Sequence, residues 1–286
     1  MVADGYLRKL QLELTDTLTD FAKYCQEHDL TWFLISGSAL GALRHGGFIP
    51  WDDDLDVGML RSDYERFLEC AARDYPEEYV VESPESNDHM AAMFAKVSRR
   101  GTRFGTQETI EAGYDQGIFL DVIPLDRLAP EGRERRSQLR NARFWMMVSY
   151  LYHAKSVNVP HSGLLGSVER IACSLAHVVI HAALNQKIIL RNYARSTLVG
   201  SDWTNDEWCF LTSRFDLFFP SDILIPPSVA RFENHVFPVP ANPERYLELM
   251  YGNWRELPPV EKRHVHAPLR IEFSDGDIWE DASRKG

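Results

Sequence analysis

Cysteine and basic residues are both scarce in this chain of 286 residues. Its four cysteines, at positions 25, 70, 173 and 209, include no CxxC pair, which argues against a compact disulfide framework and a cysteine-rich zinc site. Lys and Arg together number 31 against 42 Asp and Glu, giving a net charge of -11. A non-specific nucleic-acid binder needs surplus cations to displace phosphate counterions, so we expect no nucleic-acid partner.

Long hydrophobic runs are also missing. The first residues alternate charged with apolar positions, whereas a signal peptide has a basic start followed by an unbroken apolar run. The most apolar stretch, residues 171–184, is interrupted by Ser174, His177 and His181 and is well short of the roughly 20 apolar residues of a membrane span. We therefore expect a cytoplasmic protein that has free thiols and contains no transmembrane segment.

The overall composition is that of a folded globular protein. Hydrophobic residues make up 44%, charged residues 26% and aromatic residues 12% of the chain, which argues against disorder as the main state. At about 150 residues per domain, the length predicts one large domain or two that pack closely together.

Helical and strand-like patterns alternate over the N-terminal part of the chain. Apolar residues recur every three or four positions from Leu7 to Cys25, which predicts an amphipathic helix. The S-x-x-E spacing of Ser62 and Glu65 predicts a capped helix that continues to about residue 73. Short apolar runs predict strands at 32–35, 55–59, 79–81, 93–97 and 118–123. The pattern is typical of an α+β or α/β fold.

The second half of the chain begins with long helices, predicted over residues 131–196 and joined by a loop at 158–163. Mixed structure follows: residues 229–236 predict a hairpin that turns at Glu233 and Asn234, and Asn242 with Pro243 predicts the start of a helix that ends near Gly252. The segment from residue 274 to the end is expected to fray or to dock only weakly.

Four aspartates, Asp52, Asp53, Asp54 and Asp56, lie within five positions. If all were ionised and close together they would repel one another strongly, so a cation is expected beside them. On an extended strand Asp54 and Asp56 point to the same face with Cα atoms about 6.5 Å apart, so both can reach one or two divalent ions. The alternative is a solvated acidic turn or a structural Ca²⁺ loop, although the spacing of an EF-hand is missing.

The all-oxygen ligand set favours Mg²⁺ or Mn²⁺ over zinc, and these ions usually act by bridging substrate phosphates. Phosphoryl-type transfer is therefore the predicted reaction. Gly37 and Ser38 fall between a predicted strand and a predicted helix, where backbone N–H groups and a hydroxyl could hold a phosphate.

Asp121 is flanked by apolar residues and needs a partner. Two interpretations stay open: neighbouring strands bring it to Asp54 and Asp56, or it pairs with an arginine. Asp126, which follows Pro124 and Leu125, is interpreted as a turn or cap residue.

Several other side chains are candidates for ligand contacts. Phosphate contacts are open to Arg44, His45, Lys96, Arg99 and Arg100, although surface ion pairing is the commoner role of such residues. Trp51 could stack on a base or simply pack. His177 and His181 are four residues apart on a predicted helix, but without a third ligand nearby they are interpreted as core or interface histidines.

The segment GSALGALRHGGFIPWDDDLDVG, residues 37–58, resembles the signature of the LicD-type phosphocholine transferase family. That family includes the fukutin-related ribitol-phosphate transferases and belongs to the nucleotidyltransferase-fold superfamily. The similarity is strongest over residues 32–67 and resumes at FLDVIPLD, residues 119–126, where Ile123 stands at a position that is commonly Phe. FENHVFPVP at 232–240 and YGNW at 251–254 resemble C-terminal elements of the family.

The resemblance implies a nucleotidyltransferase-like mixed β-sheet flanked by helices. Residues 1–130 would form the catalytic core, 131–200 a helical insertion that contacts the acceptor, and 201–286 a mixed region that packs on the core. Asp54, Asp56 and Asp121 would be catalytic metal ligands, and Asp52 would orient them or accept the acceptor's proton. With the candidate phosphate contacts added, the cofactor-binding residues would be Gly37, Ser38, Arg44 and Lys96.

The activity implied by the resemblance is transfer of a phosphoalcohol, most readily phosphocholine from CDP-choline, to a glycan hydroxyl, with release of CMP. The acceptor would be teichoic acid, lipopolysaccharide or another surface polysaccharide, or its lipid-linked precursor. One or two Mg²⁺ or Mn²⁺ ions would neutralise the diphosphate. Choline would call for an aromatic cage; the residues available, which are equally typical of a core, are Trp145, Tyr150, Tyr152, Trp203 and Trp208.

Three alternatives remain open. A true nucleotidyltransferase would move NMP from an NTP with the same carboxylates and release pyrophosphate. A non-catalytic binding module on the same fold is a second, although the clustered carboxylates argue against it because they are costly to retain. The helical insertion could also touch a membrane, which would put the protein at the inner face of the membrane.

Overall fold

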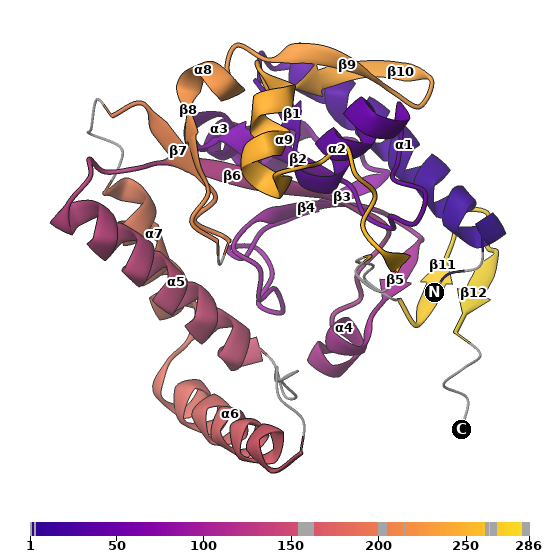
Figure 1. The fold of residues 1–286 in the computed structure, drawn as a ribbon. Helices are drawn as coiled ribbons and strands as arrows, with labels where there is room; N and C mark the ends of the chain where they lie inside the picture. The colour runs from indigo at the N-terminus through magenta and orange to yellow at the C-terminus, as the bar shows by residue number, and fades with distance from the viewer. Residues whose placement is uncertain are drawn as a thin grey trace.

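A computed structural model of the chain describes residue 2 and residues 4–153, 163–199, 205–213, 215–260, 263 and 268–281. Its central element is a mixed β-sheet with helices packed around it (Figure 1). The expected mixed sheet flanked by helices is confirmed. The strands, in spatial order, are β1 (Phe33–Leu34), β2 (Asp56–Leu60), β6 (Phe119–Arg127), β4 (Ala95–Arg99) and β3 (Tyr79–Glu82).

The middle of the sheet is formed by β2 and β6, which are parallel, while the flanking pairs are antiparallel. β6 is longer than predicted because it continues through Pro124 to Arg127, where β7 (Glu207–Cys209) and then β8 (Phe218–Pro220) extend the pairing. In register, Asp56 of β2 lies opposite Asp121 of β6, and Asp121 lies opposite Lys96 of β4. Three charged residues therefore follow one another across three strands.

The first helix, α1 (Asp4–Glu27), confirms the amphipathic pattern read from the sequence. Leu10, Leu14, Leu18, Phe21 and Cys25 are all buried in the main core. α2 (Ser36–His45) and α3 (Arg61–Asp74) follow β1 and β2 directly. The capping box predicted at Ser62 does not form, because α3 begins at Arg61 with Leu60 in the cap position.

Asp126 is not a turn or cap residue. It lies inside β6, is completely buried, and its carboxylate accepts hydrogen bonds from Arg61 Nε at 2.7 Å and Nη2 at 3.0 Å. This two-point pairing satisfies a buried charge and joins the start of α3 to the sheet. The sequence pattern Pro-Leu-Asp had suggested a turn, whereas the long-range partner stabilises a strand.

The C-terminal part packs on the core through several short elements. The hairpin of β9 (Ser228–Phe232) and β10 (His235–Val239) turns at Glu233, as predicted, and the side chain of Asn242 caps α9 (Pro243–Tyr251). The remaining helix here is α8 (Ser221–Leu224).

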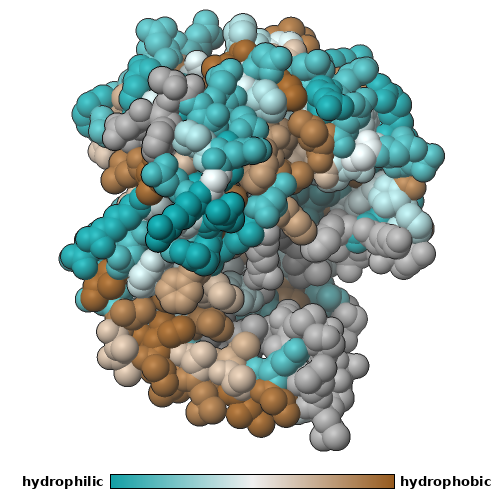
Figure 2. Space-filling model, turned by 60° about the vertical axis from the view of Figure 1, so that its left-hand side comes forward, coloured by the Kyte–Doolittle hydropathy of each residue, from teal (hydrophilic) through white to brown (hydrophobic). Residues whose placement is uncertain are grey.

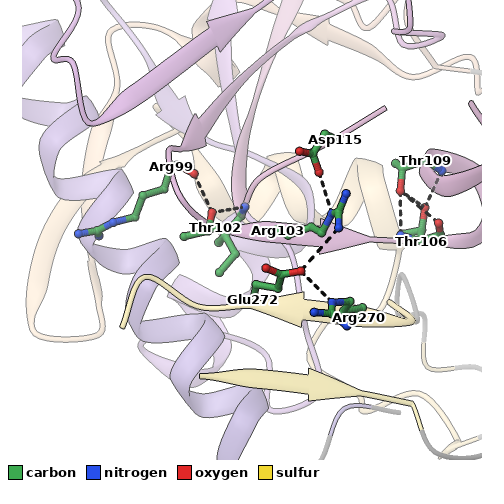
Figure 3. A network of polar contacts seen from close by, with 9 residues as sticks. Arg99, Thr102, Arg103, Thr106, Thr109, Asp115, Arg270 and Glu272 are labelled. Atoms are coloured by element: carbon green, nitrogen blue, oxygen red, sulfur yellow. Dashed lines mark hydrogen bonds and ion pairs between the residues drawn. The ribbon is translucent and has the colours of Figure 1, made fainter. Parts of the chain in front are cut away.

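The end of the described chain does not fray. β11 (Arg270–Glu272) pairs with β12 (Ile278–Glu280) and with β5 (Arg103–Gly105), and Trp279 is buried. Figure 3 shows the polar contacts that reinforce this pairing: Arg103 Nε contacts Asp115 at 2.7 Å, and Glu272 contacts both Arg103 and Arg270. The prediction of a frayed end was wrong up to residue 281, because burial of Trp279 offsets the polar composition.

Three long helices, α5 (Arg133–His153), α6 (Gly163–Ala183) and α7 (Gln186–Leu198), extend from the sheet (Figure 1), and a short α4 (Gln107–Ala112) follows β5. α5 and α7 pack on each other around a second core that includes Ala142, Val148, Ile189 and Tyr193. α6 contacts α5 and lies farther from the central sheet. The loop predicted at 158–163 lies almost wholly outside the described residues.

Candidate active site

A pocket of about 610 Å³ lies at the start of α2. One wall is formed by the beginning of α2 and the acidic segment that precedes β2. The opposite wall comes from the end of α9 and the chain that follows it. The side chains and backbone that line the pocket are Ser36, Gly37, Leu40, Arg44, Ile49, Trp51, Asp52, Asp54, Asp56, Tyr251, Asn253, Trp254, Glu256, Leu257, Pro258, Pro259 and Arg263.

The beginning of α2 is held firmly against β2. The backbone N–H of Ser36 donates to the hydroxyl of the buried Tyr246 at 3.1 Å, and the backbone N–H of Asp56 donates to Ser38 Oγ at 2.8 Å. Ser38 is buried and does not line the pocket; its hydroxyl instead fixes the backbone that carries Asp56. Gly37 does line the pocket, so the two residues of the predicted phosphate site have different positions.

Gly37 is the residue that lets the acidic segment approach the helix. A Cβ at this position would lie 2.9 Å from Asp52 Oδ2, closer than real Cβ contacts come. The absence of a side chain therefore brings the Asp52 carboxyl against the first turn of α2. Helix N-termini carry partial positive charge and unsatisfied N–H groups, which favours carboxylates and phosphates there.

Asp52, Asp54 and Asp56 all face the pocket, whereas Asp53 is buried away from it. This is the alternation expected of an extended segment, although the regular strand begins only at Asp56. Burial, followed by the neighbouring carboxyl of Asp54 with which it shares a hydrogen bond, raises the pKa of Asp52 to about 9. The group is stable in the protonated form unless a cation offsets the charge of its neighbours.

The crowded carboxyl groups are chemically suited to the Mg²⁺ or Mn²⁺ that the family resemblance implies. Asp52 retains its proton because burial and the neighbouring carboxylates disfavour its charged form. A set of carboxylate oxygens in this situation is suited to a hard divalent cation such as Mg²⁺ or Mn²⁺. Within the described parts of the chain, no three His, Cys, Asp or Glu side chains already converge in a ligand arrangement. Asp54 and Asp56, two residues apart and both lining the pocket, could hold an ion there.

Asp121 lies next to Asp56 on the neighbouring strand but does not line the pocket. Its Oδ1 atom is 2.6 Å from Lys96 Nζ, and both side chains are almost fully buried. The alternative in which Asp121 pairs with a basic residue is thus realised with lysine rather than arginine. Strand pairing also places it beside Asp56, so the first interpretation holds for Asp56 and not for a shared pocket with Asp54, and the second holds with lysine in place of arginine.

Basic and aromatic residues form the wall opposite the carboxylates. Arg44 Nη1 donates to the backbone oxygens of Trp254 at 2.9 Å and Glu256 at 3.3 Å, which ties α2 to this wall. Partial burial lowers the pKa of Arg44 from its ordinary value. The guanidinium of Arg263 stacks on Trp51, with its Cζ atom 3.9 Å from the ring centroid.

Two hydrogen-bond donors in this wall are buried without a partner among the described residues, Trp254 Nε1 and Arg263 Nε. Buried donors in native proteins almost always have partners, so such groups in a pocket point to a ligand or water that completes them. The pocket therefore offers carboxylates on one side and orphaned donors on the other.

Comparison with known proteins shows what the chain is similar to. Residues 29–106 match the family model described as LicD/FKTN/FKRP, nucleotidyltransferase domain. Lipopolysaccharide cholinephosphotransferase LicD of Haemophilus influenzae is 26% identical over 268 residues, which cover 91% of this chain and 95% of that protein. Uncharacterized proteins of Rickettsia prowazekii and Rickettsia typhi are each 38% identical over 55 residues, about a fifth of either chain. The chain is thus similar to LicD-type proteins, most clearly over residues 29–106 and at lower identity along nearly its whole length.

The segment matched by the LicD family model carries only part of the candidate site. It includes Gly37, Arg44, the aspartates at 52–56 and Lys96, but ends before Asp121 and before the wall at 251–263. The wall was missed as a site by reasoning from the sequence. The one sequence feature that could have indicated this wall is YGNW at 251–254, which resembles a C-terminal element of the LicD family. No motif in the sequence indicated Arg263.

The aromatic residues considered as a choline cage do not line the pocket, as far as the structure describes them. Trp145 and Tyr152 pack against the second core, and Trp208 is buried with its Nε1 donating to Ser221 Oγ at 2.7 Å. Tyr150 also lies outside the pocket, and Trp203 is outside the described residues. The aromatics that do line it are Trp51, Tyr251 and Trp254.

The remaining candidates have structural roles. His177 Nδ1 contacts the backbone oxygen of Leu151 at 2.7 Å, and His181 stacks on Tyr152 with ring centroids 4.7 Å apart. His45 accepts a hydrogen bond from Arg44 Nε at 3.0 Å. Arg100 Nε donates to the backbone oxygen of Glu77, and neither Arg99 nor Arg100 lines the pocket.

Proposed function

We propose that this protein transfers phosphocholine from CDP-choline to a hydroxyl of a cell-surface glycan or its lipid-linked precursor, releasing CMP. One observation carries the proposal: a pocket that sets three aspartates and a helix N-terminus against a wall with two unpartnered donors. The Haemophilus influenzae relative, similar along nearly the whole chain, is named as a cholinephosphotransferase of lipopolysaccharide. We therefore propose a phosphotransferase acting on a glycan of that class.

The proposed metal site consists of Asp54 and Asp56, with Asp121 beside them on β6. A bound Mg²⁺ or Mn²⁺ would neutralise charge on the diphosphate. Asp121 is held by Lys96, so Lys96 acts by fixing this carboxylate and supplying a positive charge next to it. The N–H groups at the start of α2 and the guanidinium of Arg263, which line the pocket, would bind phosphate oxygens.

In the proposed reaction the acceptor hydroxyl oxygen forms a bond to the choline-bearing phosphorus. The bond from that phosphorus to the bridging oxygen breaks, and CMP leaves with the electron pair. The acceptor's proton passes to a carboxylate or to water. Asp52, whose carboxyl lies against the helix start, would exchange this proton.

A nucleotidyltransferase is the second candidate, favoured by the nucleotidyltransferase description of the matching family model. The same carboxylates would serve, but the α-phosphorus of an NTP would be attacked and pyrophosphate would leave. The two reactions differ in their small product.

The test is a product assay with purified protein, Mg²⁺, lipopolysaccharide or teichoic acid, and either CDP-choline or CTP. Phosphocholine transfer predicts CMP from CDP-choline and choline label in the glycan, both lost in Asp54→Asn. Pyrophosphate released from CTP would support nucleotidyl transfer instead. If neither CMP nor pyrophosphate were released with any acceptor, a catalytic role would be contradicted.

A further inference from the structure

α6 presents an apolar surface to solvent. Its outward residues are spaced three or four positions apart, as on one side of a helix, and each is more than 60% exposed: Val168, Ile171, Leu175, Val178 and Val179. Phe144 and Met147 of the adjacent α5 are also more than half exposed. In Figure 2 these segments form a continuous hydrophobic surface at the bottom of the molecule. Folded proteins rarely leave so large a patch uncovered.

α7 does not share this exposure. Ile189 and Tyr193 are buried against α5, so α7 is held by the second core while α6 lies outside it. No single described helix is long and apolar enough to cross a membrane. The segments Ser167–Ala183 and Gln186–Leu198 meet that test only when taken together, and they are bent by 98° at their junction. The geometry fits a helix lying on a surface.

The helical insertion, residues 131–200, has a net charge opposite in sign to that of the rest of the chain. Residues 131–200 contain ten Lys and Arg against three Asp and Glu, whereas the remainder contains 21 against 39. The insertion therefore carries a net charge of +7 on a chain whose total is -11. The cations exposed on α5 and α7 are Arg133, Arg136, Arg140, Lys187, Arg191 and Arg195.

We propose that α6 and the adjoining end of α5 form a docking surface for an anionic lipid bilayer. The apolar residues of α6 would enter the boundary between headgroups and acyl chains, and the cations of α5 and α7 would face the anionic headgroups. Helices that bind membranes in this way combine an apolar face with basic residues, and each basic residue near the surface strengthens binding.

A second copy of this chain fits the surface less well than a bilayer does. In a twofold dimer the same patch meets itself, which would bring together two copies of an insertion that carries a net charge of +7. A bilayer with anionic lipids complements both the apolar residues and the surrounding charge.

The test is flotation of the full chain with vesicles of pure phosphatidylcholine and with vesicles of phosphatidylcholine and phosphatidylglycerol in equal parts. We expect binding to the anionic vesicles, weakened in concentrated NaCl. The double substitution Leu175→Ser and Val179→Ser should reduce the partition coefficient at least tenfold. Lys187→Gln with Arg191→Gln, in the part of α7 that directly follows α6, should reduce it about fivefold per residue on anionic vesicles only.

The matched control is Val229→Ser with Val236→Ser, which removes two equally exposed apolar side chains from the β9–β10 hairpin and should leave vesicle binding unchanged. Circular dichroism and thermal melting establish that each variant is folded. Failure of the wild type to float with anionic vesicles would overturn the proposal. So would a dimer in light scattering that Leu175→Ser and Val179→Ser dissociate while vesicles bind neither protein. None of these readouts depends on catalytic activity.

Discussion

Lys96 Nζ lies 2.6 Å from Asp121 Oδ1, and this buried ion pair stands in register with Asp56 across three neighbouring strands. The ammonium group also lies 3.6 Å from the centroid of the Phe119 ring, so it is enclosed on a second side. A carboxylate held in this way is a fixed negative charge immediately beside the acidic segment. The pair thus links the middle of the sheet to the candidate site.

Lys96→Met should be strongly destabilising because it leaves the Asp121 carboxylate buried without its partner. Breaking a buried pair by removing one member costs about 3–5 kcal/mol of unfolding free energy. The measurement is urea denaturation at pH 7. The control is Arg245→Met, which breaks the exposed pair with Glu248 and should cost less than about 1 kcal/mol. Equal effects of the two substitutions would contradict a buried role for Lys96.

Gly37→Ala should impair the site while leaving most of the fold intact. The added Cβ would lie 2.9 Å from Asp52 Oδ2, so the carboxyl or the first turn of α2 has to move. Displacements of this order in a catalytic geometry cost about 100-fold in rate. Phosphocholine transfer measures the effect, with Gly5→Ala in α1, where no atom lies within 4 Å of an added Cβ, as the control. Full activity of Gly37→Ala would show that the close approach is unimportant.

Glu233 should make stability depend on pH. Its carboxylate accepts hydrogen bonds from Arg8 at 2.6 Å and from the backbone N–H of Phe48 at 3.2 Å, and the Arg8 bond, with the Phe48 bond adding to it, lowers its pKa despite partial burial. A lowered folded pKa stabilises the protein above the unfolded value, near 4.3, and this contribution is lost as pH falls through the folded pKa.

Glu233→Gln should therefore lower the free energy of unfolding by on the order of 1 kcal/mol at pH 7 and by progressively less below pH 4. The effect is small because Arg8 is exposed to solvent. Urea denaturation of both proteins at pH 7 and pH 3 measures the difference. A cost that is the same at both pH values would rule out the ionised carboxylate as its source.

Arg263→Ala should weaken donor binding about tenfold or more, since a hydrogen bond to a charged group contributes about 1.5–3 kcal/mol. Its Nε has no partner among the described residues, and the side chain, which stacks on Trp51, lines the pocket. Isothermal titration with CDP-choline gives the affinity. Arg255→Ala, which removes the guanidinium stacked on Trp254, is the matched control because Arg255 does not line the pocket. An unchanged affinity for Arg263→Ala would remove this residue from the site.

Local patterns were enough to predict the main elements. The regular apolar spacing from Leu7 to Cys25 predicted α1, the alternation at 52–56 separated the pocket-facing aspartates from Asp53, and Asn242 with Pro243 predicted the start of α9. These features depend on near neighbours in the chain. The family resemblance was needed to favour the approach of Asp121 to Asp56, because that approach depends on parallel pairing of β2 with β6, two strands that are far apart in the sequence.

Features that depend on distant partners were not predictable from the same patterns. Asp126 was taken for a turn residue because nothing near it in the chain reveals Arg61 as its partner. The final hairpin was expected to fray because its composition is polar, and its pairing with β5 joins the end of the chain to its first half. Arg263 enters the site only because the chain after α9 folds back over Trp51.

The central claim is that Asp54 and Asp56 hold a divalent cation through which the donor binds. Isothermal titration of CDP-choline, with Mg²⁺ and with EDTA, on the wild type and on Asp54→Ala/Asp56→Ala tests it most directly. We predict binding that requires Mg²⁺ and is lost in the double variant, with weaker binding of CTP. Binding that persists in EDTA, or that survives in the folded double variant, would contradict the claim.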